Sequence, residues 1–302
     1  MADKPRIGIA KLLETGSRTP SNLAQGPDAM ERGGLLELLD EIGCQVAESR
    51  TARLTPKEEK EYGAWHRLGL ASRHLAEIVA DQRRNGLFTL GLLSNCNALM
   101  GMLAGLQRSG PTSSPLRVGL VWIDAHADYN TPETTLSGML GGMPVAVSTG
   151  QCLHRLRQKC GLDPALPTRY VTMAGVRDTD PLEQELLDRS EIQHLTVDHI
   201  RNLSPVIDLE IERLATITDT TYVHIDIDAL DPAEVPGHGL TVPNGPTSEE
   251  MAEALELIFE HPSAAAFGVA SYPTGKDPDK KTLKAVYKMV EGVVRGLKNR
   301  ED

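Results

Sequence analysis

Short runs of apolar, β-prone residues alternate with amphipathic stretches along the whole chain. Such alternation predicts right-handed β–α–β crossovers and a largely parallel sheet with helices on both of its faces. We therefore expect an α/β protein with a three-layer α/β/α fold and a mostly parallel central sheet. The runs that have the length and apolar character of buried strands are residues 6–10, 88–93, 118–123, 170–173, 222–225 and 264–270.

Helical patterns with recognisable start or stop signals lie between these strands. The Asn85-Gly86 pair ends one of them, and Thr247 forms a capping box with Glu250 at the start of another. A final helix is predicted to follow Asp277, with a proline at its first position. The four predicted helices before it cover residues 72–84, which Asn85-Gly86 ends, 181–189, 207–215, and 248–259, which Thr247 opens.

Composition and net charge limit the kinds of molecule that the chain is expected to bind. The chain is 40% hydrophobic and only 4% aromatic, which suits helices packed on a parallel sheet. Its formal net charge of -11 argues against binding to nucleic acid or to an anionic membrane. The four cysteines form no CxxC pair, and neither a signal peptide nor a membrane span is apparent. We expect a soluble cytoplasmic protein with a single domain over residues 1–302.

Two of the predicted strands run directly into side chains that bind metals. The first continues as Asp124-Ala125-His126-Ala127-Asp128, and the second ends with Asp226-Ile227-Asp228. Clustered carboxylates at the ends of buried strands repel one another and lose hydration unless cations neutralise them. Carboxylates with one imidazole suit Mn²⁺, although Mg²⁺, Fe²⁺, Ni²⁺ and Zn²⁺ are less easily excluded. Either motif alone is compatible with ordinary turn residues, but the two together predict a site for divalent cations.

The same segments resemble the signatures of a known family. Residues 124–138 are similar to the DAHxD signature of arginases and agmatinases and to the residues after it, and residues 226–232 resemble their DxDxxDP signature. Residues 26–36 and 175–181 resemble two further family segments. This resemblance to the ureohydrolase family covers nearly the whole chain. It implies the arginase-like fold, a binuclear manganese site, a guanidino substrate and a homotrimer or homohexamer.

The resemblance also implies a role for each matching metal-binding residue. Asp124 and Asp226 would bridge two Mn²⁺ ions, His126 and Asp228 would complete one of them, and Asp128 would bind the other. A bridging water would lose a proton to this pair and, oriented by Asp128, attack the guanidino carbon. Urea or a urea analogue and an amine would then be released.

The residues that match the family's contacts to an amino-acid substrate are present as well. By resemblance, Asn130 and Ser137 hold the α-carboxylate, and Asp180 helps to hold the α-amino group. The plainer alternative is that Asn130 and Ser137 are turn residues and that Asp180, before Pro181, caps a helix. Since all three occur in the matching loops, an amino-acid-like substrate is favoured.

Two departures from the family affect its metal site and its proton transfer. Cys96 stands where the family's GGDH histidine binds the more exposed ion, and it is either a soft thiolate ligand or a buried bystander. One of the two ions is then weakened, changed or absent. Gly141 replaces the histidine that acts as proton shuttle, and His238, in the loop after the second metal strand, is the candidate substitute. His224 is assigned either to packing or to support of the metal ligands.

A third departure concerns the substrate. Ser271, or a neighbour, stands where arginases place a glutamate beside the guanidinium, and a charged guanidinium would lack its counter-ion there. A hydroxyguanidine is less basic and needs no such partner. The leading hypothesis is a hydrolase of an N-hydroxyguanidino amino acid such as Nω-hydroxyarginine. The alternatives are a catalytically silent homologue that serves as a scaffold or regulator, and a hydrolase of another amidine.

Overall fold

The computed structural model describes residues 4–17, 21–111 and 113–300, and one eight-stranded sheet runs through them. The strand order is β2-β1-β3-β8-β7-β4-β5-β6, and every neighbouring pair is parallel. The predicted parallel sheet is confirmed. Its strands are β1 (Arg6–Leu12), β2 (Gln45–Ala52), β3 (Phe88–Leu93), β4 (Val118–Ile123), β5 (Val171–Ala174), β6 (Gln193–Leu195), β7 (Thr220–Asp226) and β8 (Ala264–Ala270).

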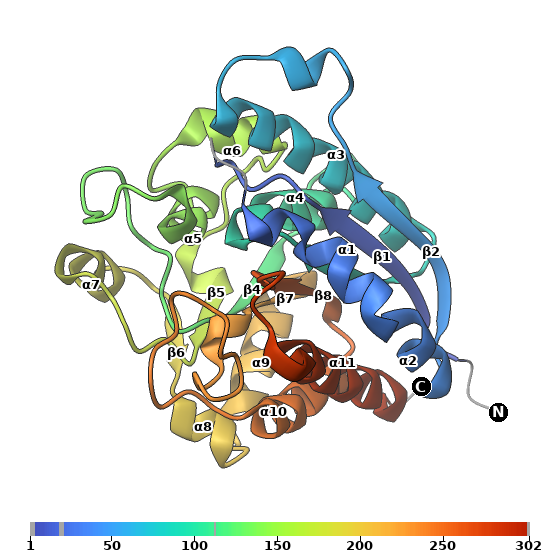
Figure 1. The fold of residues 1–302 in the computed structure, drawn as a ribbon. Helices are drawn as coiled ribbons and strands as arrows, with labels where there is room; N and C mark the ends of the chain where they lie inside the picture. The colour runs from blue at the N-terminus through green and yellow to red at the C-terminus, as the bar shows by residue number, and fades with distance from the viewer. Residues whose placement is uncertain (1–3, 18–20, 112, 301–302) are drawn as a thin grey trace.

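Helices cover both faces of this sheet, which gives the predicted three layers (Figure 1). One layer contains α1 (Gly26–Met30), α2 (Leu36–Glu41), α8 (Val197–Arg201), α9 (Val206–Ile217), α10 (Ser248–Glu260) and α11 (Lys281–Asn299). The other contains α3 (Ala64–Arg84), α4 (Leu99–Gln107), α5 (Pro144–Ser148), α6 (His154–Cys160) and α7 (Pro181–Asp188). Each layer packs its own hydrophobic core against the sheet. None of the described helices is long and apolar enough to cross a membrane.

The predicted helix signals are confirmed, with one correction at the last helix. The Thr247 hydroxyl accepts from the Glu250 amide at 3.2 Å, as a capping box requires. After Asp277, however, residues 278–280 form a short 3-10 turn, and α11 begins only at Lys281. The reason is that Asp279 and Lys280 adopt left-handed backbone angles, which interrupt the helix. The Asp277 carboxylate still caps α11, because it accepts from two of its amides.

The four central strands β3, β8, β7 and β4 bring the candidate site together. Ile123 pairs with Ile225, so Asp124 and Asp226 follow at adjacent positions. Ala270 pairs with both Asp226 and Leu93, so Ser271 and the segment leading to Cys96 end at the same edge. Because the carboxyl ends of parallel strands meet at one edge of a sheet, these side chains converge there.

Candidate metal centre

Carboxylate, imidazole and thiol side chains meet above the ends of β3, β4 and β7. These side chains form three groups of potential ligands, and within each group the ligand atoms lie within 4.8 Å of one another. Five of the six predicted ligands belong to these groups, and His238 joins them. The sixth, Asp128, lines the same cavity but belongs to none of the groups. The groups are Cys96 with Asp124 and Asp226, Asp124 with His126 and Asp228, and Asp226 with Asp228 and His238.

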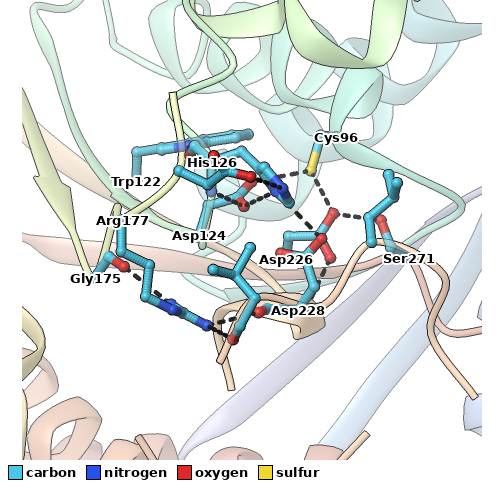
Figure 2. A network of polar contacts seen from close by, with 12 residues as sticks. Cys96, Trp122, Asp124, His126, Gly175, Arg177, Asp226, Asp228 and Ser271 are labelled. Atoms are coloured by element: carbon cyan, nitrogen blue, oxygen red, sulfur yellow. Dashed lines mark hydrogen bonds and ion pairs between the residues drawn. The ribbon is translucent and has the colours of Figure 1, made fainter. Parts of the chain in front are cut away.

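In both acidic loops, an aspartate side chain accepts a hydrogen bond from the backbone amide two residues later. The Asp124 Oδ1 atom accepts from the amide of His126 at 2.8 Å, and the Asp226 Oδ1 atom accepts from the amide of Asp228 at 3.2 Å. Such a bond turns the chain sharply at the end of a strand. As a result, His126 and Asp228 lie beside the aspartates that precede them, and the His126 Nδ1 atom is 3.5 Å from Asp228 Oδ2 (Figure 2).

The electrostatics of the cluster call for positive charge. Burial, together with repulsion among the carboxylates, raises the pKa of Asp124, Asp128 and Asp226, and raises that of Asp228 to about 6. Burial opposes protonation of His126, but hydrogen bonds to Asp124 and Asp228 outweigh it and raise its pKa to about 11. No lysine or arginine is among the described residues that line the cavity. The buried Asp228 Oδ1 atom also has no hydrogen-bond partner in the described chain. This donor set fits divalent cations.

The metal-free protein should therefore lose stability as the pH rises from about 4 through about 6. Because the pKa of these aspartates is raised on folding, the folded state holds protons that the unfolded state has already released. Stability that is complete below the unfolded pKa is then lost as the pH passes the folded pKa, about 6 for Asp228. For Asp228, whose pKa rises from 3.8 to about 6, this corresponds to roughly 3 kcal/mol at about 1.4 kcal/mol per pKa unit.

This dependence can be measured by urea unfolding at several pH values in EDTA and in excess Mn²⁺. Mn²⁺ should reverse the trend, because cation binding requires deprotonated ligands. Asp228→Asn should flatten the EDTA curve, since it removes one of the shifted carboxyl groups. An EDTA curve that is flat for the native chain would contradict the charge balance described above.

Cys96 belongs to a hydrophobic core cluster, but its sulfur atom faces the carboxylates of Asp124 and Asp226. It opens a short 3-10 turn after β3, which the Asn95 side chain caps by accepting from the Asn97 amide. The Cys96 Sγ atom donates to Asp226 Oδ2 at 2.9 Å. Burial, and then the nearby charges of Asp226 and Asp124, raises the pKa of the thiol well above its ordinary value. Without a cation the thiol is thus protonated, and a bound cation would displace that proton.

Ser271 contacts the same carboxylate oxygen as Cys96. Its hydroxyl donates to Asp226 Oδ2 at 2.5 Å, while its backbone adopts a left-handed φ of 72° just after β8 (Figure 2). The side chain is buried and lines the cavity. Two of the three departures from the family signatures that the sequence resembles, Cys96 and Ser271, therefore meet at one candidate metal ligand, Asp226.

Ser271→Ala should weaken the binding of Mn²⁺ by about 10- to 100-fold, the usual effect of losing a hydrogen bond that orients a ligand. Titration of the metal-free protein with Mn²⁺ measures this change directly. Ser148→Ala is a matched control, because Ser148 is also buried but does not line the cavity. Equal Mn²⁺ affinity in Ser271→Ala and the native chain would show that this bond does not orient Asp226.

His238 enters the cavity because Gly237 lets its loop approach the segment after β8. A Cβ atom on Gly237 would lie 1.6 Å from the carbonyl oxygen of Lys276. The His238 side chain is 6% exposed, with Nε2 3.9 Å from Asp226 Oδ1 and Nδ1 3.7 Å from Asp228 Oδ2. At Gly141, by contrast, an added Cβ would meet nothing within 4 Å. The cavity therefore holds an imidazole at His238 and open space at Gly141.

His224 packs away from the cavity. Its ring stacks on Trp122 at 4.6 Å, and its Nδ1 atom hydrogen-bonds to the Tyr222 hydroxyl at 2.9 Å. Burial lowers the pKa of His224 to about 3, so the ring is neutral. It is not among the residues that line the cavity. Of the two interpretations from sequence, packing is the one that these contacts support.

The residues matched to the amino-acid end of the substrate line the same cavity of about 730 Å³. The Asn130 amide donates to Asp180 Oδ2 at 3.0 Å and accepts from the Thr134 hydroxyl at 2.9 Å. The Ser137 hydroxyl accepts from the Met139 amide at 3.2 Å. Asp180 is also the N-cap residue of α7, so it can cap this helix and line the cavity at the same time.

Three residues that shape the site were not singled out from sequence. The Glu183 carboxylate accepts from the amides of Tyr129 and Asp180, and its capping-box spacing from Asp180 was the available signal. Trp65 lines the cavity as well. Arg177, which lies in a segment matched to the family, fixes the loop after β7 (Figure 2). Its guanidinium donates at 2.8–3.4 Å to the carbonyls of Gly175, Asp228, Leu230, Val242 and Pro243.

Comparison with known proteins places the chain in a family. The model of the arginase family matches residues 24–294. An arginase of Bacillus caldovelox is 30% identical over 265 residues, covering 85% of this chain and 87% of that protein. The crystal structure of an arginase from Bacillus subtilis has a TM-score of 0.83 at 25% identity and covers 95% of this chain and 98% of that one.

The fold by itself does not select a substrate. A formimidoylglutamase from Bacillus subtilis shares it with a TM-score of 0.73, at only 16% identity, over 100% of this chain and 90% of that one. The assignment rests instead on the family model and on the arginase relatives, which span most of the chain. This protein belongs to the arginase family.

Proposed function

We propose that the protein is a metal-dependent amidinohydrolase that cleaves an N-hydroxyguanidino amino acid, such as Nω-hydroxyarginine, to hydroxyurea and an amine. The observation that carries this proposal is the cavity that joins the buried carboxylate cluster to Asn130, Ser137 and Asp180. At Ser271 the cavity offers a hydroxyl, bonded to the proposed metal ligand Asp226, and not a further carboxylate that could pair with a guanidinium. A neutral hydroxyguanidine suits that environment better than a charged guanidinium does.

The metal ligands divide into two overlapping sets. Cys96, Asp124, Asp128 and Asp226 would hold one ion, and Asp124, His126, Asp226 and Asp228 the other. Mn²⁺ is the proposed metal because the donors are mostly carboxylates. When bound, the two ions would lower the pKa of water and stabilise negative charge at the reacting carbon.

The chain's own residues would orient the substrate and move the proton. Asn130 and Ser137 would donate to the carboxyl oxygens of the amino acid, Asp180 would accept from its α-amino group, and Asp128 would orient the attacking water. The new bond joins the water oxygen to the guanidino carbon, and the bond to the side-chain nitrogen breaks. His238 would donate a proton to that nitrogen as the amine departs. Ser271 would lie at the guanidino end of the substrate.

The test is turnover by the Mn²⁺-loaded enzyme of arginine, Nω-hydroxyarginine and agmatine. We expect kcat/KM for Nω-hydroxyarginine to exceed that for arginine by about 100-fold, which corresponds to the few kcal/mol that an unpaired buried charge costs. Agmatine, which lacks the carboxylate, should be a poor substrate. Activity confined to arginine would overturn the substrate assignment. No turnover of any substrate, together with no bound metal, would favour the silent homologue.

Domain organisation, assembly and location are also proposals. A single domain is supported by the one sheet that contains all eight strands. Assembly into trimers or hexamers and residence in the cytoplasm rest on the family resemblance and stay predictions.

A further inference from the structure

Arg177 contacts both of the loops that carry the candidate metal ligands. It lies just after β5, and its own amide donates to the carbonyl of Ala125 at 2.9 Å, between Asp124 and His126. Its guanidinium donates to the carbonyl of Asp228, in the other loop, at 3.3 Å (Figure 2). One residue therefore joins the segment after β4 to the segment after β7.

The same guanidinium holds both ends of the stretch in which His238 lies. It donates to the carbonyl of Leu230 at 3.4 Å and to that of Val242 at 2.8 Å. Arg177 is not among the described residues that line the cavity. It thus acts on the site from behind the ligands and does not meet a substrate there.

The sheet does not hold all of the ligands equally. Asp124 and Asp226 lie at the ends of β4 and β7, where the Asp124 amide donates to Ala174 and Asp226 pairs with a residue of β8. His126 and Asp228 lie two residues further on, outside both strands, and they belong to the ligand group of a single ion. The contacts through Arg177 tie together the two segments that carry these outer ligands.

The guanidinium also brings positive charge close to the carboxylates. Burial lowers the pKa of Arg177, while the negative charges of Asp228, Asp124 and Asp231 oppose that shift. An arginine stays charged in such surroundings, and its planar fork can donate to several carbonyls at once. A lysine would supply the same charge, but its single ammonium group cannot span carbonyls in separate segments.

We propose that Arg177 is a positioning residue of the metal centre. It holds His126 and Asp228 at the spacing that one of the two ions requires, and it fixes the loop that brings His238 into the cavity. The inference rests on the proposed metal-dependent function and adds to it a residue outside the cavity lining.

The experiment is a titration of the metal-free full chain with Mn²⁺, followed by calorimetry and by the electron paramagnetic resonance of single and paired ions. Arg177→Gln and Arg177→Lys should both weaken one of the two ions by about 10- to 100-fold, the usual effect of losing a group that orients a ligand. The other ion should keep its native affinity. If Arg177→Gln does not fold, Arg177→Lys, which keeps the charge, decides the comparison.

Arg201 offers a matched control. Its guanidinium donates to two other carbonyls of the loop after β7, those of Asn244 at 3.2 Å and Gly245 at 2.7 Å. Arg201→Gln and Arg201→Lys should bind both ions as the native chain does. Native Mn²⁺ affinity in Arg177→Lys would show that charge alone suffices and would overturn the positioning role. An equal loss of affinity in the Arg177 and Arg201 variants would overturn it as well, because general loosening of the loop would then be the cause.

Hydrogen exchange in EDTA supplies a readout that needs no metal. Exchange should become faster in residues 124–128 and 226–231 of both Arg177 variants, and only around residues 244–247 of the Arg201 variants. Faster exchange in both metal-binding loops, with no Mn²⁺ bound even by the native chain, would support the tie through Arg177 and refute the metal centre. Unchanged exchange and unchanged Mn²⁺ affinity in the Arg177 variants would overturn the inference and leave the metal centre standing.

Discussion

Asp226→Asn is expected to remove bound divalent cations and to lower kcat/KM by at least about a thousandfold. Asp226 belongs to two of the three ligand groups and is the carboxylate to which both Cys96 and Ser271 donate. A metal pair supplies several kcal/mol of transition-state stabilisation, and each 1.4 kcal/mol is about tenfold in rate. Asparagine keeps the shape and the oxygen that accepts from the Asp228 amide, so the loop should retain its turn.

Metal content, kcat/KM and unfolding in EDTA distinguish a lost ligand from a damaged fold. In EDTA, Asp226→Asn should be at least as stable as the native chain, because the change removes one of several buried carboxylates that repel one another. Asp231→Asn is the matched control: Asp231 lies in the same loop but outside the cavity lining, and its bond to the Ala233 amide survives the change. Normal activity and metal content in Asp226→Asn would refute the metal centre.

His238→Gln is expected to lower kcat by about 10²- to 10⁴-fold, the usual contribution of a positioned acid or base, with little change in KM. The reason is that Gly141 offers no side chain and His238 is the imidazole held beside Asp226 and Asp228. The variant should keep its metal content. His154→Gln, at an exposed position outside the cavity lining, should leave kcat unchanged.

His238→Gln also distinguishes a proton-donating role of the imidazole from a role as a metal ligand. His238 lies within one of the three potential ligand groups. If His238→Gln loses metal in parallel with activity, the imidazole is a ligand, and the proposed proton donor is wrong. Full kcat in the variant would show that it is neither.

The strands and ligands that could be predicted from sequence are those whose signals are local. Central strands such as β4 and β7 are buried along their whole length and read as continuous apolar runs. The candidate metal ligands come directly after or at the end of these strands in the sequence, so the same segments predicted both the strands and the metal site. The edge strand β2 was missed because its exposed and half-buried residues alternate without an apolar run. Helix α4 was missed for the opposite reason: it is buried on all sides and has no polar face.

The parts of the site that escaped prediction depend on contacts between distant segments. The bond from Ser271 to Asp226 requires the register between β7 and β8, which no local pattern specifies. The entry of His238 depends on the close approach of Gly237 to Lys276. Trp65 lines the cavity from the first turn of α3, which starts at Ala64, earlier than the helix predicted from residue 72.

The most direct test of this account is the amount of Mn²⁺ bound per chain, measured after metal loading for the native protein and for Cys96→His. The account predicts two ions per native chain, with no gain from the histidine, because Cys96 lies among the carboxylates as a ligand would. One ion or none in the native protein, restored to two by Cys96→His, would contradict it and show that the cysteine disables the metal centre.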